Sequence, residues 1–132
     1  MNLKQNKGVT LADAIIAITI FMIFTGLIIT ISYNIYLQSN FVKRNSSATN
    51  YIVDLFEYAQ VLEFKDVTTE KLEEYINQKE GISTLNNSSK GYKMKVSVTE
   101  NKEGYIKQLD ATVSYNLGKK EKNVTMSTLI NK

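Results

Sequence analysis

The strongest pattern in the chain is an almost unbroken apolar run near its start. Within residues 14–31 the only polar side chains are Thr19, Thr25 and Thr30. A helix of about 20 apolar residues crosses the hydrocarbon core of a bilayer. The 18 residues of this run reach the lower edge of that range, and the run softens only gradually to residue 37. A signal peptide is a poor alternative, because the nearest small-residue cleavage site, at residues 46–48, lies far downstream. We therefore expect a membrane-embedded helix that carries a small domain.

A second apolar pattern, with steps of three and four residues, follows the first. It predicts that the helix continues to about residue 64 and buries one face. The stripe consists of Ala48, Tyr51, Ile52, Leu55, Phe56, Ala59 and Leu62. The opposite face holds Asn50, Asp54, Glu57, Tyr58 and Glu63. A short helix is expected over residues 70–79, with Leu72, Tyr75 and Ile76 on one face, and a loop over residues 82–91.

After Gly91 the period changes to two. Alternation of apolar and polar residues predicts three amphipathic strands joined by short turns, near residues 92–99, 105–117 and 124–130. Their apolar face and the helical stripe must both be buried, and each can bury the other. The predicted class is α+β: a long N-terminal helix packed against a small three-stranded antiparallel sheet, with one short extra helix.

One acid, Asp13, stands at the start of the apolar run, where a charge near the membrane requires a partner. It ends the string Gly8-Val9-Thr10-Leu11-Ala12-Asp13, which follows a short leader containing Lys4 and Lys7. This arrangement resembles the prepilin cleavage site of type IV pilins and of the pseudopilins of secretion and competence systems. The chain departs from the family pattern at two positions, with Asp13 in place of Glu and Val9 in place of Phe or Met, and these departures favour a minor subunit.

The resemblance implies that a prepilin peptidase cuts between Gly8 and Val9 and methylates the new amine of Val9. It divides the chain into a leader peptide (1–8), a transmembrane and filament-core helix (9–37), an amphipathic helical continuation (38–64) and a small α+β part (65–132). The leader would be cytoplasmic and the C-terminal domain extracytoplasmic, before assembly into a cell-surface filament or pseudopilus. Further implied partners are other pilin-like subunits, an assembly ATPase and a membrane platform protein.

Two residues of the apolar helix have expected roles in assembly. The Asp13 carboxylate of one subunit would pair with the Val9 amine of a neighbour, because an unpaired charge in a low-dielectric medium is penalised. Gly26 is the place where the helix would bend most easily, or where neighbouring helices would pack closely; both interpretations stay open.

Composition argues against catalysis. The chain contains no Cys and no His, so it lacks a thiolate site, the commonest general base and the commonest transition-metal ligand. No glycine-rich phosphate loop is present. We therefore expect no enzyme activity, no cofactor and no metal site. The net charge is +3, and Lys4 and Lys7 of the leader supply two of these charges.

Two alternatives remain. The first is direct DNA binding, as in a competence pseudopilus, through a candidate basic patch near the strand ends. Its residues are Lys93, Lys95, Lys119, Lys120 and Lys122, with Lys90 and Lys107 as further members. The second is a plain N-terminally anchored membrane protein with an incidental Asp13.

Overall fold

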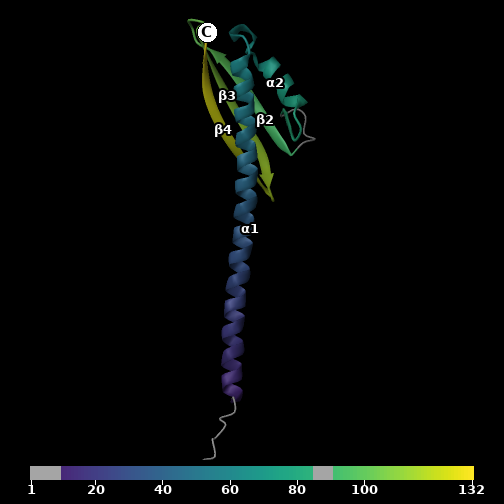
Figure 1. Cartoon of the computed structure of the whole chain (residues 1–132), viewed down its shortest axis with the longest axis vertical. Helices are drawn as coiled ribbons and strands as arrows, with labels where there is room; N and C mark the ends of the chain where they lie inside the picture. The colour runs from purple at the N-terminus through teal and green to yellow at the C-terminus, as the bar shows by residue number, and fades with distance from the viewer. Residues whose placement is uncertain (1–9, 85–90) are drawn as a thin grey trace, which may run out of the picture. The chain divides into compact units, whose positions relative to one another are not determined.

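A computed structural model of the chain describes residues 10–84 and 91–132, and these residues form the predicted α+β fold (Figure 1). The helices are α1 (Leu11–Val61), the short 3-10 helix η1 (Phe64–Asp66) and α2 (Thr69–Gln78). The strands are β1 (Ile82–Thr84), β2 (Tyr92–Glu100), β3 (Ile106–Leu117) and β4 (Lys120–Asn131).

Helix α1 passes through both of the compact units into which the chain divides, Met1–Ser39 and Asn40–Lys132. In the first unit, none of the described residues, 10–39, is buried. The prediction of a helix that continues beyond the apolar run is confirmed, although α1 ends at Val61 rather than near residue 64, and η1 lies between α1 and α2.

The C-terminal part of α1 buries the predicted stripe in the core of the second unit. Ala48, Ile52 and Ala59 have no exposed surface, and Leu55 and Phe56 are also buried. Tyr58, predicted on the face opposite the stripe, is partly buried and packs against the core. Its ring stacks on the ring of Tyr75 in α2 with 3.9 Å between centroids, because α2 covers that side of α1.

Helix α2 begins and ends one residue before the predicted bounds. Thr68 is its N-cap, and the Thr68 hydroxyl accepts a hydrogen bond from the amide of Lys71 at 3.4 Å. Such a cap satisfies an amide that has no partner within the helix. Leu72 and Ile76 are buried, as the pattern indicated.

The sheet has four strands in the order β1-β2-β3-β4. The three predicted antiparallel strands are present as β2, β3 and β4, but the prediction of a three-stranded, purely antiparallel sheet is wrong. Strand β1 pairs in parallel with β2, with Ile82 opposite Tyr92, whereas β2–β3 and β3–β4 are antiparallel. Residues 82–84 were expected to be a loop, but all three are buried. A three-residue strand that is buried throughout shows no alternation, so periodicity could not reveal it.

Side chains of neighbouring elements fix β1 in place. The Asn77 side-chain oxygen accepts hydrogen bonds from the Thr84 amide at 3.2 Å and from the Thr84 hydroxyl at 3.3 Å. Before β1, Gly81 has a φ of 81°, and a Cβ there would lie 2.5 Å from the Tyr51 hydroxyl. That hydroxyl donates to the carbonyl of Glu80 at 3.1 Å. Both the backbone angle and the close approach therefore require glycine at position 81.

The predicted apolar face of the sheet is confirmed, with one charged member. Met94 and Val96 of β2 and Leu109, Ala111 and Val113 of β3 are buried together with the α1 stripe. Lys107 lies on the same face of β3 and is 6% exposed. Its ammonium donates to the carbonyls of Phe64 at 2.8 Å and Val67 at 3.0 Å. Lys107 therefore joins β3 to the connection between α1 and α2.

Candidate functional site

The predicted cleavage site lies at the edge of the described chain. Gly8 and Val9 fall outside the described residues, so the structure first shows the motif at Thr10. Of the predicted assembly residues, Asp13 and Gly26 are described, and both belong to α1.

Thr10 and Asp13 form a reciprocal cap at the start of α1. Asp13 Oδ2 accepts hydrogen bonds from the Thr10 hydroxyl at 2.7 Å and from the Thr10 amide at 3.1 Å. In return, Thr10 Oγ1 accepts from the Asp13 amide at 3.3 Å. The Thr10 carbonyl accepts the first helical bond, from Ala14, at 3.1 Å, so Thr10 is the N-cap residue. This pattern is a capping box, in which two helix-terminal amides are satisfied by two side chains.

Sequence reasoning assigned Asp13 only to pairing between subunits and missed this second role. The signal was present, because Thr10-Leu11-Ala12-Asp13 has the spacing of a capping box, with Asp where Glu or Gln is usual. The shorter Asp side chain reaches the Thr10 amide. Asp13 is nevertheless exposed within this chain.

The helix that follows presents apolar side chains on all sides. Large exposed residues include Ile15, Ile16, Phe21, Ile23, Phe24, Leu27, Ile28 and Ile31. The three hydroxyls in the run donate to carbonyls four residues earlier: Thr19 to Ile15, Thr25 to Phe21 and Thr30 to Gly26, at 2.8–2.9 Å. Satisfied polar groups of this kind suit a helix surrounded by lipid or by other apolar helices.

This helix is long and apolar enough to span a membrane, and none of its most apolar stretch is buried within the chain. At Gly26, a Cβ would have no neighbour within 4 Å in the described chain. No contact within the described residues therefore requires glycine at this position, which is the predicted site of bending or close helix packing.

The predicted basic patch divides between two faces of the sheet. Lys120 and Lys122 share their face of β4 with Val124 and Met126, because side chains alternate along a strand. Lys93 and Lys95 lie on the opposite face of β2, since Met94 and Val96 are buried. Lys107 is buried beneath the sheet, so its inclusion in the patch is wrong. Lys90 lies outside the described residues.

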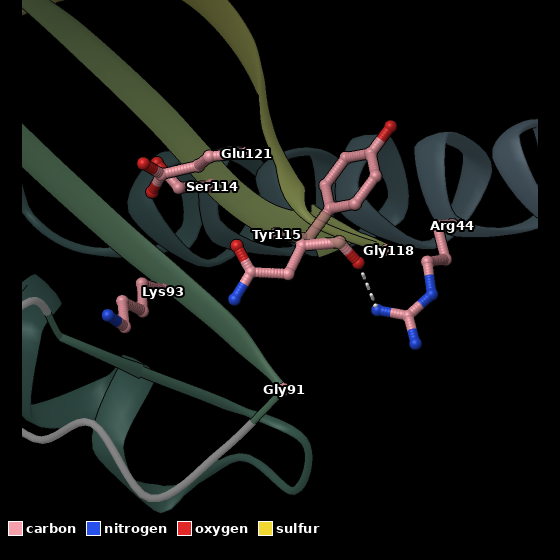
Figure 2. Close-up of a pocket in the computed structure, with 8 residues that line it drawn as sticks. Arg44, Gly91, Lys93, Ser114, Tyr115, Gly118 and Glu121 are labelled. Carbon is pink, nitrogen blue, oxygen red and sulfur yellow. Dashed lines mark hydrogen bonds between the residues drawn. The ribbon is translucent and has the colours of Figure 1, made fainter.

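Arg44 of α1, which sequence reasoning did not assign to the patch, contacts the end of β3 near these lysines. Its guanidinium donates to the carbonyl of Asn116 at 2.9 Å (Figure 2). Next to it, the Tyr115 hydroxyl donates to the Asn45 side chain at 3.4 Å, and burial raises the pKa of Tyr115. Together these bonds hold the β3–β4 turn against α1.

A cavity of about 410 Å³ opens beside this contact. It is lined by Arg44, Gly91, Lys93, Ser114, Tyr115, Asn116, Gly118 and Glu121. Figure 2 shows Arg44 from α1, Lys93 from β2 and Glu121 from β4 around it. Polar groups and charges of both signs line the cavity, a setting that suits water and small ions rather than an apolar ligand.

A comparison with protein-family models found no match, and searches of curated proteins and of solved structures found none either. The architecture itself, a long N-terminal apolar helix packed on a small sheet, is pilin-like.

Proposed function

We propose that the chain is a structural subunit of a type IV pilus-like filament or pseudopilus. A prepilin peptidase cleaves the precursor after Gly8 and methylates Val9. The subunit is stored in the membrane through its N-terminal helix, with the second unit on the extracytoplasmic side. An assembly ATPase and a membrane platform protein then add it to a growing filament.

The observation that carries this proposal is the apolar surface of the first unit. From Thr10 to Ser39 none of the residues is buried in the chain, although most are large and apolar. A surface of this kind requires lipid or other protein around it. The motif ending at Asp13 stands directly before that surface. A filament subunit needs both features, because its helix leaves the bilayer and joins a bundle of similar helices.

Asp13 has two roles in the proposal. In the single chain its Oδ2 atom completes the capping box with Thr10. During assembly its negative charge attracts the Val9 amine of a neighbouring subunit, which would otherwise be an unpaired cation in a low-dielectric environment. A subunit inserted out of register leaves both charges unpaired, so this pairing selects the correct register.

The chain contains no cysteine, which allows a direct test of helix bundling by disulfide cross-linking. We would introduce one cysteine into the apolar helix, Ala17→Cys. A separate control protein carries its cysteine on the exposed face of β4, Ser127→Cys. In cells with the assembly machinery, we expect oxidation to give Ala17→Cys dimers, and far fewer dimers when the assembly ATPase is deleted. Equal dimer yields with and without the ATPase, or no Ala17→Cys dimers, would instead indicate a plain membrane anchor.

A further inference from the structure

A group of cations gathers at one end of the second unit, where β2 begins and β3 ends. Its members, here named the basic rim, are Lys43, Arg44, Lys93, Lys119, Lys120 and Lys122. All six are exposed or half-buried. Within the described parts of the chain, none of the six has a carboxylate within 4.0 Å, although Glu121 lines the same cavity as Lys93.

The fold assembles the basic rim from three segments that are distant in sequence. The bond from Arg44 to Asn116 places the β3–β4 turn beside α1. That turn consists of Gly118, which has a φ of 62°, and Lys119. Lys93 is opposite Ser114 in the register of β2 and β3, close to the same end of the sheet. A second cavity joins Lys43 and Arg44 to Gly91 at the start of β2.

The chain limits how far this rim can lie from the apolar helix. Only five residues separate Leu37, the end of the apolar run, from Lys43. Even a fully extended connection of this length reaches only about 20 Å. If the apolar run is stored in a bilayer, the basic rim is therefore kept close to the layer of lipid headgroups, which is itself several ångströms thick.

Positive charge near the headgroup layer can be matched by the negative charge of anionic phospholipids. Basic residues beside a membrane helix bind anionic lipid headgroups, and each charge near the surface strengthens binding about fivefold. At the opposite end of the sheet, lysines and acids are mixed. There Lys65, Lys107 and Lys132 line the same cavity as Glu63 and Glu100, Lys107 is buried, and Lys65 pairs with Glu63 at 2.8 Å.

We propose that the basic rim binds the headgroups of anionic phospholipids while the subunit is stored in the membrane. The inference rests on the proposed function, because it requires the apolar helix to lie in a bilayer. Binding holds the second unit down on the bilayer surface. The contacts are lost when the subunit leaves the membrane for the filament, so anionic lipid opposes extraction.

The test uses the full chain in nanodiscs of phosphatidylcholine alone or with phosphatidylglycerol. One fluorescent label is placed near the rim at Asn123→Cys, and in a separate protein at Glu103→Cys in the β2–β3 turn. Asn123 is opposite Ser114, eight residues beyond Ile106, where β3 begins after the turn, so these labels are about 25–30 Å apart. A lipid that carries a spin label on its headgroup quenches a fluorescent label that approaches the bilayer surface.

We expect quenching of the Asn123→Cys label to rise with phosphatidylglycerol and to fall in high salt, and the Glu103→Cys label to change little. The variant Lys119→Gln/Lys120→Gln/Lys122→Gln should lose the phosphatidylglycerol effect. A matched variant with the same change in charge, Lys65→Gln/Lys102→Gln/Lys132→Gln, should keep it.

Equal quenching in both lipids, or equal loss in the two triple variants, overturns the proposal. Duplex DNA added to the same nanodiscs tests whether the basic rim binds nucleic acid rather than lipid. Binding of DNA that depends on the rim lysines, with no effect of phosphatidylglycerol, would assign the rim to nucleic acid instead. A chain that fails to enter nanodiscs would contradict the proposed function itself, whereas insertion without a lipid effect contradicts only the lipid contact.

Discussion

The carboxylate of Asp13 accepts hydrogen bonds from both the hydroxyl and the amide of Thr10, at 2.7 and 3.1 Å. The residue expected to pair with a neighbouring subunit therefore also caps its own helix. Capping requires a hydrogen-bond acceptor at position 13, whereas pairing with an amine requires a negative charge. Because these requirements differ, substitutions can separate the two roles.

The first prediction separates charge from capping at Asp13. Asp13→Asn keeps an acceptor oxygen and removes the charge, so we expect the helix start to remain and incorporation into filaments to fall at least tenfold. Asp13→Glu keeps both and should assemble. Asp13→Ala should still be cleaved but should not assemble. Filament incorporation is measured by immunoblotting of the sheared or assembled fraction against the membrane fraction. Normal incorporation of Asp13→Ala would rule out the pairing role.

A second prediction concerns the cap itself. Thr10→Val keeps the shape of the side chain but removes the hydroxyl that bonds to Asp13. Loss of an N-cap costs about 1 kcal/mol, which corresponds to about fivefold faster local opening. Hydrogen exchange of the Asp13 amide in detergent micelles measures this opening. Thr10→Ser retains a hydroxyl and is the control; if Thr10→Val exchanged no faster than Thr10→Ser, the capping box would have no energetic role.

Gly26 gives a third prediction. A Cβ at this position meets none of the described residues within 4 Å, and alanine favours a helix over glycine by about 1 kcal/mol. Gly26→Ala should therefore slow amide exchange around residue 26 in micelles. If bending or close helix packing at Gly26 serves assembly, the same variant should enter filaments less efficiently. Unchanged incorporation would show that neither role exists.

The buried Lys107 leads to a fourth prediction. Lys107→Met preserves most of the side-chain volume but leaves the carbonyl of Val67 without the bond that it accepts at 3.0 Å. Hydrogen bonds to charged groups contribute about 1.5–3 kcal/mol, so we expect a loss of that size in the free energy of unfolding of the second unit. Denaturant unfolding of the full chain in detergent measures it. Lys95→Met, at an exposed position of β2, should change stability by less than about 0.5 kcal/mol.

Asp110 gives a prediction on pH. Hydrogen bonds from Ser127 and from Gln108 lower the pKa of Asp110 below its ordinary value of 3.8. A carboxyl with a lowered folded-state pKa stabilises the fold above its unfolded-state pKa, and this contribution is lost as pH falls through the folded-state value. Asp110→Asn should therefore reduce the drop in Tm of the full chain when the pH is lowered from 5 to 3. Parallel pH profiles of wild type and variant would contradict this.

The sequence predicted those parts of the fold that repeat with a clear period. The α1 stripe around Ile52 and Leu55 and the alternation in β3 were both correct, because burial of one face leaves a periodic pattern. Strand β1 is too short and too buried to show such a pattern. Lys107 was misplaced because a lysine appears polar in sequence, and only the fold brings the carbonyls of Phe64 and Val67 to its ammonium.

The candidate site, like the fold, was predicted only where its residues are close together in sequence. The string from Gly8 to Asp13 is local and could be found from neighbouring residues alone. The contact between Arg44 and Asn116 joins residues 72 positions apart, so no local pattern indicates it. The basic rim depends on that contact, which explains why the sequence suggested a patch that included Lys107 and omitted Arg44.

Processing by a prepilin peptidase can be measured by the intact mass of the full chain after co-expression with such an enzyme. We predict a mature protein that begins at Val9, lighter than the precursor by residues 1–8 and carrying one added N-terminal methyl group. Gly8→Val should remain uncleaved, whereas Gly26→Ala, a glycine substitution away from the cut, should be cleaved normally. Recovery of wild-type protein with residues 1–8 still attached, under conditions in which a known prepilin is cleaved, would contradict the proposal that the chain is a prepilin-like subunit.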